Sequence, residues 1–308
     1  MSALRSALED YLALRRSMGF KLDRAGRLLA QFVAYCEAAG SETLTTQLAL
    51  SWATLPEGGS RSWHAGRLSV VRGFARYLAL FDERTEVPPP EILPNSSHRA
   101  SPYLYSANEV MALMDAAGKL RSPLRQATFS TLIGLLYVTG MRVGEALRLD
   151  RDDVDLGQRV IVVCDSKFGK SREVPIHETT ARALGAYARH RAQLCPRASS
   201  PAFFVSLAGT RLRYDNFHLA FHALVRVAGL TPRSTTCRPR PHDLRHTFAV
   251  STLIGWYRDG MEVEPRMPRL STYLGHTHPA NTYWYLEAAP ELLALAVARL
   301  QTHTEPAP

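Results

Sequence analysis

PHDLRHTF, which spans residues 241–248, is the stretch around which the chain is best interpreted. Read as a helix, it places His242 and Arg245 three residues apart on a face shared with His246. That face offers two imidazoles and one permanently charged guanidinium, which together suit the anionic oxygens of a phosphate. The stretch therefore predicts a helix with a phosphate-binding face.

Two more candidate side chains follow this stretch. Leu274-Gly275-His276 places another histidine after a glycine that ends a predicted helix, and Pro279 can start the next helix. That short helix carries Tyr283 and Tyr285, which lie about 200° apart on a helix, so only one of them can face the site.

Length and composition describe a globular protein of two domains. A chain of 308 residues is long enough for two cores, and a hydrophobic share of 46% is ordinary for such a protein. The four cysteines form no CxxC pair, which indicates reduced thiols rather than a disulfide frame or a zinc site. No apolar run reaches membrane-spanning length and the first twenty residues lack a signal-peptide core, so we expect a cytoplasmic protein with no membrane partner.

The net charge of +9 comes from arginine far more than from lysine. Arginine binds phosphate through two hydrogen bonds and stacks on bases, so a nucleic acid is the first partner to consider. A coding bias that exchanges lysine for arginine on solvated surfaces would give the same composition, so charge alone does not decide between the two explanations.

The first domain, residues 1–84, has the pattern of a set of helices. Apolar residues recur at helical spacing through residues 4–36, a third helix begins near Thr45, and a fourth runs over residues 60–81. The fourth helix has a basic face formed by Arg61, Arg67, Arg72 and Arg76. Such a face is either a surface that follows DNA or an ordinary soluble surface.

Residues 85–102 differ in character from the helices before them. Val87-Pro88-Pro89-Pro90 and Pro94-Asn95-Ser96-Ser97 can form neither a helix nor a central strand, and no apolar period continues through them. We interpret this segment as an interdomain linker, stiff where proline dominates, between domains at residues 1–84 and 103–308.

The second domain begins with helices and a glycine turn. An apolar helix over residues 123–138 leads into Thr139-Gly140-Met141-Arg142-Val143-Gly144-Glu145, a turn that opens a short helix. Arg142 has apolar neighbours and must be paired, and Glu145 is its local partner. The pair is either a purely structural ion pair or a device that aims Arg142 at a phosphate.

A small sheet follows these helices. Strands are predicted at residues 160–164 and 172–176, joined by a turn that contains Lys167. A lysine at a strand end beside a cleft can protonate a leaving oxygen, although most turn lysines only remain solvated. Helices are predicted over residues 178–194 and 213–228. The expected fold is mainly α with a small β-sheet: a helical domain followed by an α+β domain.

The end of the chain adds basic and apolar segments. A basic collar is expected around the 241–248 stretch, formed by Arg233, Arg238 and Arg240. The last helix, residues 290–301, is apolar at its contact positions and needs a partner to bury it.

These motifs together resemble those of the tyrosine recombinases, also called the phage integrase family. TGMRVGE at 139–145 is similar to the family's first arginine box, and Lys167 stands in the β-hairpin where the family keeps a lysine. HDLRH at 242–246 matches the His-x-x-Arg box and Leu274-Gly275-His276 the next histidine, although the stretch between them is longer than is common. Tyr285, nine residues after that histidine, falls at the spacing of the nucleophile. The N-terminal helices are similar to the family's core-binding domain.

The resemblance implies an activity and a role for each matched residue. In the family a tyrosine attacks a DNA phosphodiester, forms a 3′-phosphotyrosyl bond and frees a 5′-hydroxyl, with no metal or other cofactor. The catalytic set carried over by position is Arg142, Lys167, His242, Arg245, His276 and Tyr285. Arg142 and Arg245 would bind the nonbridging oxygens, and Lys167 would protonate the 5′-oxygen. His242 and His276 would donate hydrogen bonds to the phosphate or move the tyrosine's proton, and Glu145 and His246 would orient the site.

The resemblance also implies partners and a setting. Double-stranded DNA would be the substrate, and the chain would act on it as a tetramer in which the 290–301 helix docks on a neighbouring subunit. Companion recombinases are compatible with this scheme. The setting would be the bacterial cytoplasm, at the nucleoid, where the chain would act as the integrase or transposase of a mobile element.

Three other interpretations stay open. A type IB topoisomerase-like enzyme would use the same catalytic set, and a DNA-binding regulator could have lost catalysis, although the intact set argues against such loss. A metal site could be formed by His242, His246, His276 and His278. Because Arg245 would repel a dication and no glutamate stands in an HExxH position, we expect no metal.

Overall fold

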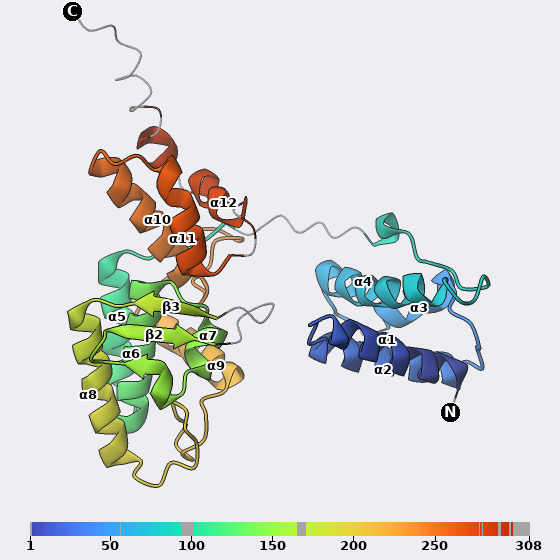
Figure 1. Cartoon of the computed structure of the whole chain (residues 1–308), viewed down its shortest axis with the longest axis horizontal. Helices are drawn as coiled ribbons and strands as arrows, with labels where there is room; N and C mark the ends of the chain where they lie inside the picture. Colours follow the sequence, from blue (N-terminus) through green and yellow to red (C-terminus); the bar gives the residue numbers. More distant parts are fainter. Residues whose placement is uncertain are drawn as a thin grey trace, which may run out of the picture. The chain divides into compact units, whose positions relative to one another are not determined.

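The structure, a computed structural model, describes residues 2–55, 57–93, 101–164, 171–276, 278, 280–288, 291–295 and 297. The chain divides into two compact units, Met1–Arg99 and Ala100–Pro308. Both units are built mainly from helices, and the second also contains a small sheet (Figure 1), which confirms the predicted fold class. Within the described residues, no helix is both long and apolar enough to cross a membrane.

The described part of the N-terminal unit has four α-helices packed around one core: α1 (Ala3–Ser17), α2 (Asp23–Ala38), α3 (Thr46–Thr54) and α4 (Arg61–Leu78). The side chains of Ser2, Thr45 and Ser60 each accept a backbone N–H at the start of a helix, which fixes where α1, α3 and α4 begin. The core joins apolar faces of α2 and α4, formed by Leu29, Phe32, Val33, Cys36, Leu68, Val71 and Phe74. The predicted helices are confirmed, with α4 ending three residues before the expected Phe81.

Residues 85–93 of the predicted linker belong with the N-terminal helices. Arg72 Nε donates to the carbonyl of Pro88 at 2.7 Å, and its Nη2 donates to the carbonyl of Pro89 at 3.0 Å. A short 3-10 turn, η1 (Pro90–Ile92), follows. By these contacts the chain up to residue 93 belongs to the N-terminal unit, and residues 94–100 lie outside the described part of the chain.

The C-terminal unit contains eight described α-helices, two 3-10 turns and one described sheet. The helices are α5 (Ala107–Gly118), α6 (Pro123–Thr139), α7 (Val143–Arg148), α8 (Glu178–Leu194), α9 (Tyr214–Val227), α10 (Asp243–Arg258), α11 (Met267–Leu274) and α12 (Ala280–Ala288). The turns are η2 (Arg151–Asp153) and η3 (Glu264–Arg266), and the strands are β1 (Val154–Asp155), β2 (Val160–Val163) and β3 (Arg172–Pro175).

The described strands form one antiparallel sheet in the order β1-β2-β3. Ile161 pairs with Val174, and Val163 pairs with Arg172 at the end where the hairpin turn begins. Ile161 and Val174 are fully buried, so this register directs their side chains into the core. The two predicted strands are confirmed, and their pairing places Arg172 beside the last residue of β2.

Two main hydrophobic clusters hold the described part of the C-terminal unit together, beside a small one around Leu124. The larger of the two main clusters surrounds α6 and α9, and the other joins α10, α11 and α12. Figure 1 shows α10, α11 and α12 together at one end of the unit, next to β3. Thr247 of α10 accepts the backbone N–H of Tyr105 at 2.9 Å and donates to the carbonyl of Asp243, which fixes the start of α10 against the segment before α5.

Candidate active site

Arginines from three separate elements meet at the C-terminal end of α11. Arg172 donates through Nε to the carbonyl of Tyr273 at 2.8 Å, Arg245 through Nη2 to that of Leu274 at 2.7 Å, and Arg142 through Nη2 to that of Gly275 at 2.8 Å. The last carbonyls of a helix have no partner inside the helix and carry the negative end of its dipole. This end of α11 therefore attracts and orients three cations.

Glu145 joins two of these arginines from the opposite side. Its Oε1 lies 2.7 Å from Arg142 Nη1 and its Oε2 lies 2.9 Å from Arg172 Nη2. The carboxylate also accepts the backbone N–H of Arg142 at 3.0 Å, so it caps the start of α7. Burial alone would raise the pKa of Glu145, but the hydrogen bonds from Arg172 and Arg142 outweigh it and lower the pKa to about 2. The predicted Arg142–Glu145 pair is thus present within a larger network.

Arg245 lies deeper than Arg142. Its side chain is 2% exposed, whereas that of Arg142 is 29% exposed. Besides Leu274, Arg245 reaches the carbonyl of Gly140 at 2.8 Å. Gly140 has a positive φ of 61° and a Cβ there would meet the Phe248 ring at 2.5 Å, so only glycine fits this turn. Burial lowers the pKa of Arg245 to about 10, which still leaves it charged at neutral pH.

Two imidazoles, those of His242 and His276, lie within electrostatic range of Arg142 and Arg245. His242 precedes α10, and its ring lies 4.8 Å from that of His246. The Nδ1 atom of His276 lies 2.7 Å from Oγ1 of Thr282, a buried residue of α12, which fixes the orientation of that ring. Burial, with the positive charges of Arg245 and Arg142, lowers the pKa of His242 to about 4 and that of His276 to about 3. Both rings are therefore neutral at neutral pH and can exchange a proton or donate a hydrogen bond.

Tyr285 lies between two of these histidines. Its ring centroid is 5.5 Å from that of His246 and 6.0 Å from that of His276, with which it stacks at 24°. The side chain is 2% exposed and packs in the cluster of α10, α11 and α12. Its interaction with Arg245 raises the pKa of that guanidinium against the effect of burial. Tyr283 is 42% exposed. The geometry favours Tyr285 over Tyr283 as the tyrosine of the site.

The sequence analysis missed Arg172. Its partners Glu145 and Tyr273 are 27 and 101 residues away in the chain, so no local spacing indicates them. The one signal in the sequence that could have indicated Arg172 is its position as a charged residue at the start of a strand that pairs with β2. Lys167, predicted to protonate the leaving oxygen, lies outside the described residues, as does part of the predicted 290–301 helix, of which residues 291–295 are helical.

The predicted basic collar is largely engaged in contacts within the protein. Arg240 forms an ion pair with Asp243 at 2.8 Å, Arg233 donates to the carbonyl of Leu104 at 2.9 Å, and Arg238 donates to that of Thr235 at 3.1 Å. Burial raises the pKa of Asp243, and the hydrogen bonds and positive charge of Arg240 oppose that rise. These arginines stabilise the approach to α10, and their contact with DNA stays a prediction.

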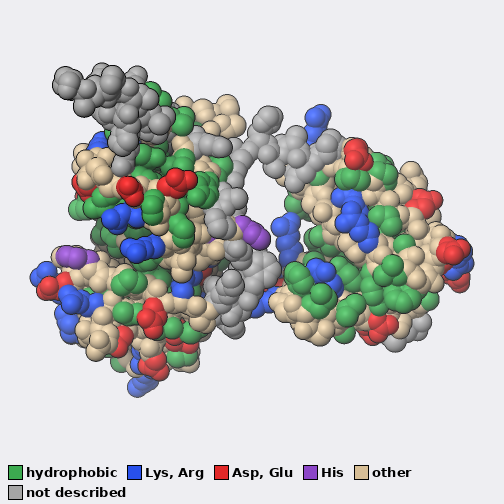
Figure 2. All heavy atoms as spheres, turned by 45° about the horizontal axis from the view of Figure 1, so that its top comes forward, with side chains coloured by type: hydrophobic (Ala, Val, Ile, Leu, Met, Phe, Trp, Pro, Cys, Tyr) green, Lys and Arg blue, Asp and Glu red, His purple; other side chains and the backbone are tan. Residues whose placement is uncertain are grey.

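The arginines of α4 fall into two groups. Arg67 is 7% exposed, stacks on the Trp52 ring at 3.7 Å and donates to the Trp52 carbonyl, and Arg72 holds the prolines that follow the helical core. These contacts favour a packing role for both residues over the predicted DNA contact. Arg61 and Arg76 stay candidates for such contact. On the face drawn in Figure 2, basic side chains of both units lie among acidic and hydrophobic ones.

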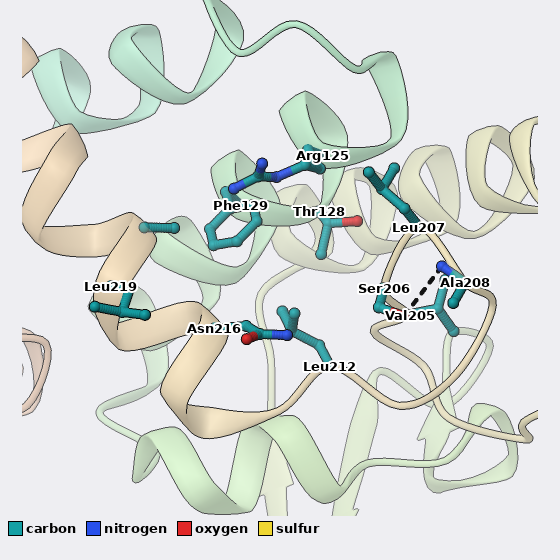
Figure 3. Close-up of a pocket in the computed structure, with 11 residues that line it drawn as sticks. Arg125, Thr128, Phe129, Val205, Ser206, Leu207, Ala208, Leu212, Asn216 and Leu219 are labelled. Carbon is teal, nitrogen blue, oxygen red and sulfur yellow. Dashed lines mark hydrogen bonds between the residues drawn. The ribbon is translucent and has the colours of Figure 1, made fainter.

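Concave sites lie elsewhere in the C-terminal unit. A cavity of about 450 Å³ between α6, α9 and the 205–212 segment is lined by Arg125, Phe129, Asn216 and neighbouring residues (Figure 3). None of the six predicted catalytic residues lines it. Within the described residues no group of three or more His, Cys, Asp or Glu side chains could hold a metal ion. The arginine and histidine cluster is instead a set of hydrogen-bond donors gathered at the end of α11, which suits the anionic oxygens of a phosphate.

Replacing Glu145 with alanine should destabilise the protein. The change leaves Arg172, which is 10% exposed, without its carboxylate, and breaking a buried ion pair in this way costs about 3–5 kcal/mol. Urea denaturation measures the free energy of unfolding. Glu178→Ala, which breaks an exposed pair with Arg182, is the matched control and should cost no more than about 1 kcal/mol. An equal decrease in the free energy of unfolding in the two variants would contradict the conclusion that Glu145 is the partner of a buried arginine.

The lowered histidine pKa values predict loss of stability on acidification. A histidine whose pKa is lower in the folded than in the unfolded protein binds its proton more readily when unfolded. The contribution of the neutral histidine to the free energy of unfolding is therefore fully present above about pH 6.5. It decreases as the pH falls toward the folded-state pKa of about 4 for His242. Each histidine contributes a slope of up to about 1.4 kcal/mol per pH unit.

Urea titrations between about pH 7 and pH 4.5 test this slope. The variant His242→Gln should show a smaller decrease in the free energy of unfolding than the wild type. His190→Gln, at an exposed position on α8, is the control and should follow the wild type. If His242→Gln also follows the wild type, the lowered pKa of His242 is wrong.

Comparison with known proteins identifies relatives along nearly the whole chain. The model of the phage integrase family matches residues 104–291. A Sinorhizobium fredii protein named putative integrase/recombinase y4rB is 44% identical over 311 residues, and the match covers 99% of each protein. The tyrosine recombinase XerC of Mycobacterium bovis is 29% identical, with 98% of this chain and 97% of that protein covered.

Solved structures share the fold. The Tn1549 transposon integrase in complex with transposon right end DNA has a TM-score of 0.66 at 17% identity, and the match covers 98% of this chain and 99% of that one. XerH site-specific recombinase bound to its difH substrate has a TM-score of 0.62 at 19% identity, over 89% of this chain and 78% of that one. Since the family model spans more than half of the chain and a relative is 44% identical along 99% of it, the chain belongs to the phage integrase family, that of the tyrosine recombinases.

Proposed function

We propose that the chain cuts and rejoins DNA at specific sites through a covalent bond between Tyr285 and the 3′-phosphate of the cleaved strand. The observation that carries this proposal is the position of Tyr285, buried between His246 and His276 beside the arginines gathered at the end of α11. A phenol in that position has cations and proton acceptors around it, which a tyrosine nucleophile needs because its free pKa is about 10.

The first step would be attack of the Tyr285 hydroxyl oxygen on the scissile phosphorus. A P–O bond to the tyrosine forms, the P–O bond to the 5′-oxygen breaks, and the phenolic proton passes to a neutral imidazole of the site. The departing 5′-oxygen takes up one proton, for which Lys167 is the proposed donor. The reverse step, with a 5′-hydroxyl from another strand as nucleophile, would rejoin the DNA and release Tyr285.

The arginines would stabilise the negative charge of the phosphate during the reaction. Arg142 and Arg245 present guanidinium groups that are fixed before substrate arrives, and such preorganised cations stabilise the charge that develops on the nonbridging oxygens. One phosphodiester is exchanged for another, so no external energy source is needed. The site therefore requires neither ATP nor a metal ion in this scheme.

The substrate and assembly follow from the relatives. Proteins similar to this chain are named integrase, recombinase and transposon integrase, and two of the structural neighbours are bound to DNA. We propose double-stranded DNA at the ends of a mobile element as the substrate, and a tetramer on that DNA as the active form. Leu293 and Val297 near the C-terminus are 52% and 53% exposed, which is compatible with docking of this segment on a neighbouring subunit.

Covalent trapping tests the proposed function. The protein is incubated with nicked duplexes that carry the ends of its own element, in the presence of EDTA, and separated on a denaturing gel. We expect a protein–DNA band in the wild type and in Tyr283→Phe, and its loss in Tyr285→Phe, because Tyr285 is the tyrosine that lies against His246 and His276.

The other outcomes separate the alternatives. Tight binding to a verified site without any band would support a DNA-binding regulator and contradict the proposal. A band with relaxation of supercoiled DNA but no exchange between two duplexes would support a topoisomerase-like enzyme. Loss of the band in Tyr283→Phe alone would contradict the choice of nucleophile.

A further inference from the structure

We propose that Arg172 is a positioning residue that sets Arg142 for phosphate binding. This inference rests on the proposed function, because it assigns Arg172 a part in the same reaction. It is carried by the chain of contacts from β3 through Glu145 to Arg142 and by the shared attachment of the two arginines to the end of α11.

Arg172 is engaged with protein atoms through every nitrogen of its guanidinium. Nε donates to the Tyr273 carbonyl at 2.8 Å, while Nη1 and Nη2 donate to the two carboxylate oxygens of Glu145 at 3.2 and 2.9 Å. The side chain is 10% exposed, against 29% for Arg142. Arg172 is therefore turned toward the protein, and Arg142 is the more accessible of the two to a phosphate.

Glu145 transmits the effect of Arg172 to Arg142. A single carboxylate accepts from both guanidinium groups, so Arg172 fixes the plane in which Glu145 holds Arg142 Nη1 at 2.7 Å. The second contact of Arg142, from Nη2 to the Gly275 carbonyl, lies two residues from the carbonyl that Arg172 holds. Arg172 thus supports both contacts that orient Arg142.

The backbone of the site is shaped to admit this arginine. Gly275 ends α11 with φ of 69°, and a Cβ added there would lie 2.8 Å from Arg172 Nη1. Glycine is therefore needed both for the conformation and for the close approach of the guanidinium. Lysine at position 172 would keep the charge but could not serve two carboxylate oxygens and a carbonyl with the planar geometry of arginine.

The test compares Arg172→Met and Arg172→Lys with the wild type on two suicide duplexes. One carries the natural phosphodiester at the scissile position, and the other carries a methylphosphonate, in which a neutral methyl group replaces a charged nonbridging oxygen. If Arg172 acts through the phosphate-binding Arg142, Arg172→Met should slow covalent cleavage of the phosphodiester about 10- to 100-fold. On the methylphosphonate the same variant should approach the wild-type rate, because little charge is left to stabilise.

The variants and controls separate positioning from simple structural loss. Arg172→Lys should be impaired in the same pattern, and it serves as the readout if Arg172→Met does not fold. Arg182→Met, which removes an exposed arginine paired with Glu178 on α8, should cleave both substrates at the wild-type rate. Equal slowing of Arg172→Met on both substrates would show a general loss of active protein and overturn the inference, as would full activity of Arg172→Lys.

A third duplex with a 5′-bridging sulfur distinguishes action on the leaving group. Sulfur departs without protonation, so rescue of Arg172→Met on this duplex would place Arg172 with the leaving-group acid and contradict our inference. Absence of any adduct in the wild type on all three duplexes would instead contradict the proposed function itself. An adduct in the wild type with no defect in Arg172→Met would leave that function standing and overturn this inference alone.

Discussion

Three consecutive carbonyls at the C-terminal end of α11 organise the site. They belong to Tyr273, Leu274 and Gly275, and each accepts a hydrogen bond from an arginine of a different element, β3, α10 or the turn before α7. Three cations held this close repel one another, and the negative end of the α11 dipole together with Glu145 offsets that repulsion. The sheet, the turn before α7 and α10 are therefore all attached to this one end of α11.

This arrangement explains why the residues around the arginines have their particular properties. His276 directly follows the last of the three carbonyls, so the turn at Gly275 that exposes them also delivers an imidazole to the same place. The collected positive charge, added to burial, keeps His242 and His276 neutral. Permanent charge therefore comes from arginine, the neutral imidazoles are the groups that we propose to exchange a proton, and α12 brings Tyr285 between His246 and His276.

Local pattern was enough to predict most of the elements and the ion pair between Arg142 and Glu145. Arg142 and Glu145 lie three residues apart, and Gly275 marks the end of α11. The choice of Tyr285 over Tyr283 came from the resemblance to the tyrosine recombinases, and it stays a prediction. Contacts that depend on the tertiary fold could not be read in this way. Arg172 meets its partners only when β3 lies beside α11.

The arginines of α4 illustrate the same limit. A basic face at helical spacing does not tell whether a guanidinium points to solvent or stacks on a tryptophan of the preceding helix, as Arg67 does on Trp52. Likewise, proline in residues 88–90 excluded an α-helix and a central strand, but it did not indicate the 3-10 turn that begins at Pro90 or the hydrogen bonds from Arg72 to the carbonyls of Pro88 and Pro89. In both cases the partner is a ring or a backbone group, which sequence patterns of charge do not report.

The most direct test of the account is to identify the residue that carries the DNA. The covalent adduct is digested with nuclease and protease, and the modified peptide is sequenced by tandem mass spectrometry. The account predicts a nucleotide joined through its 3′-phosphate to Tyr285. A nucleotide on Tyr283 or on any other residue, or a linkage through a 5′-phosphate, would contradict it.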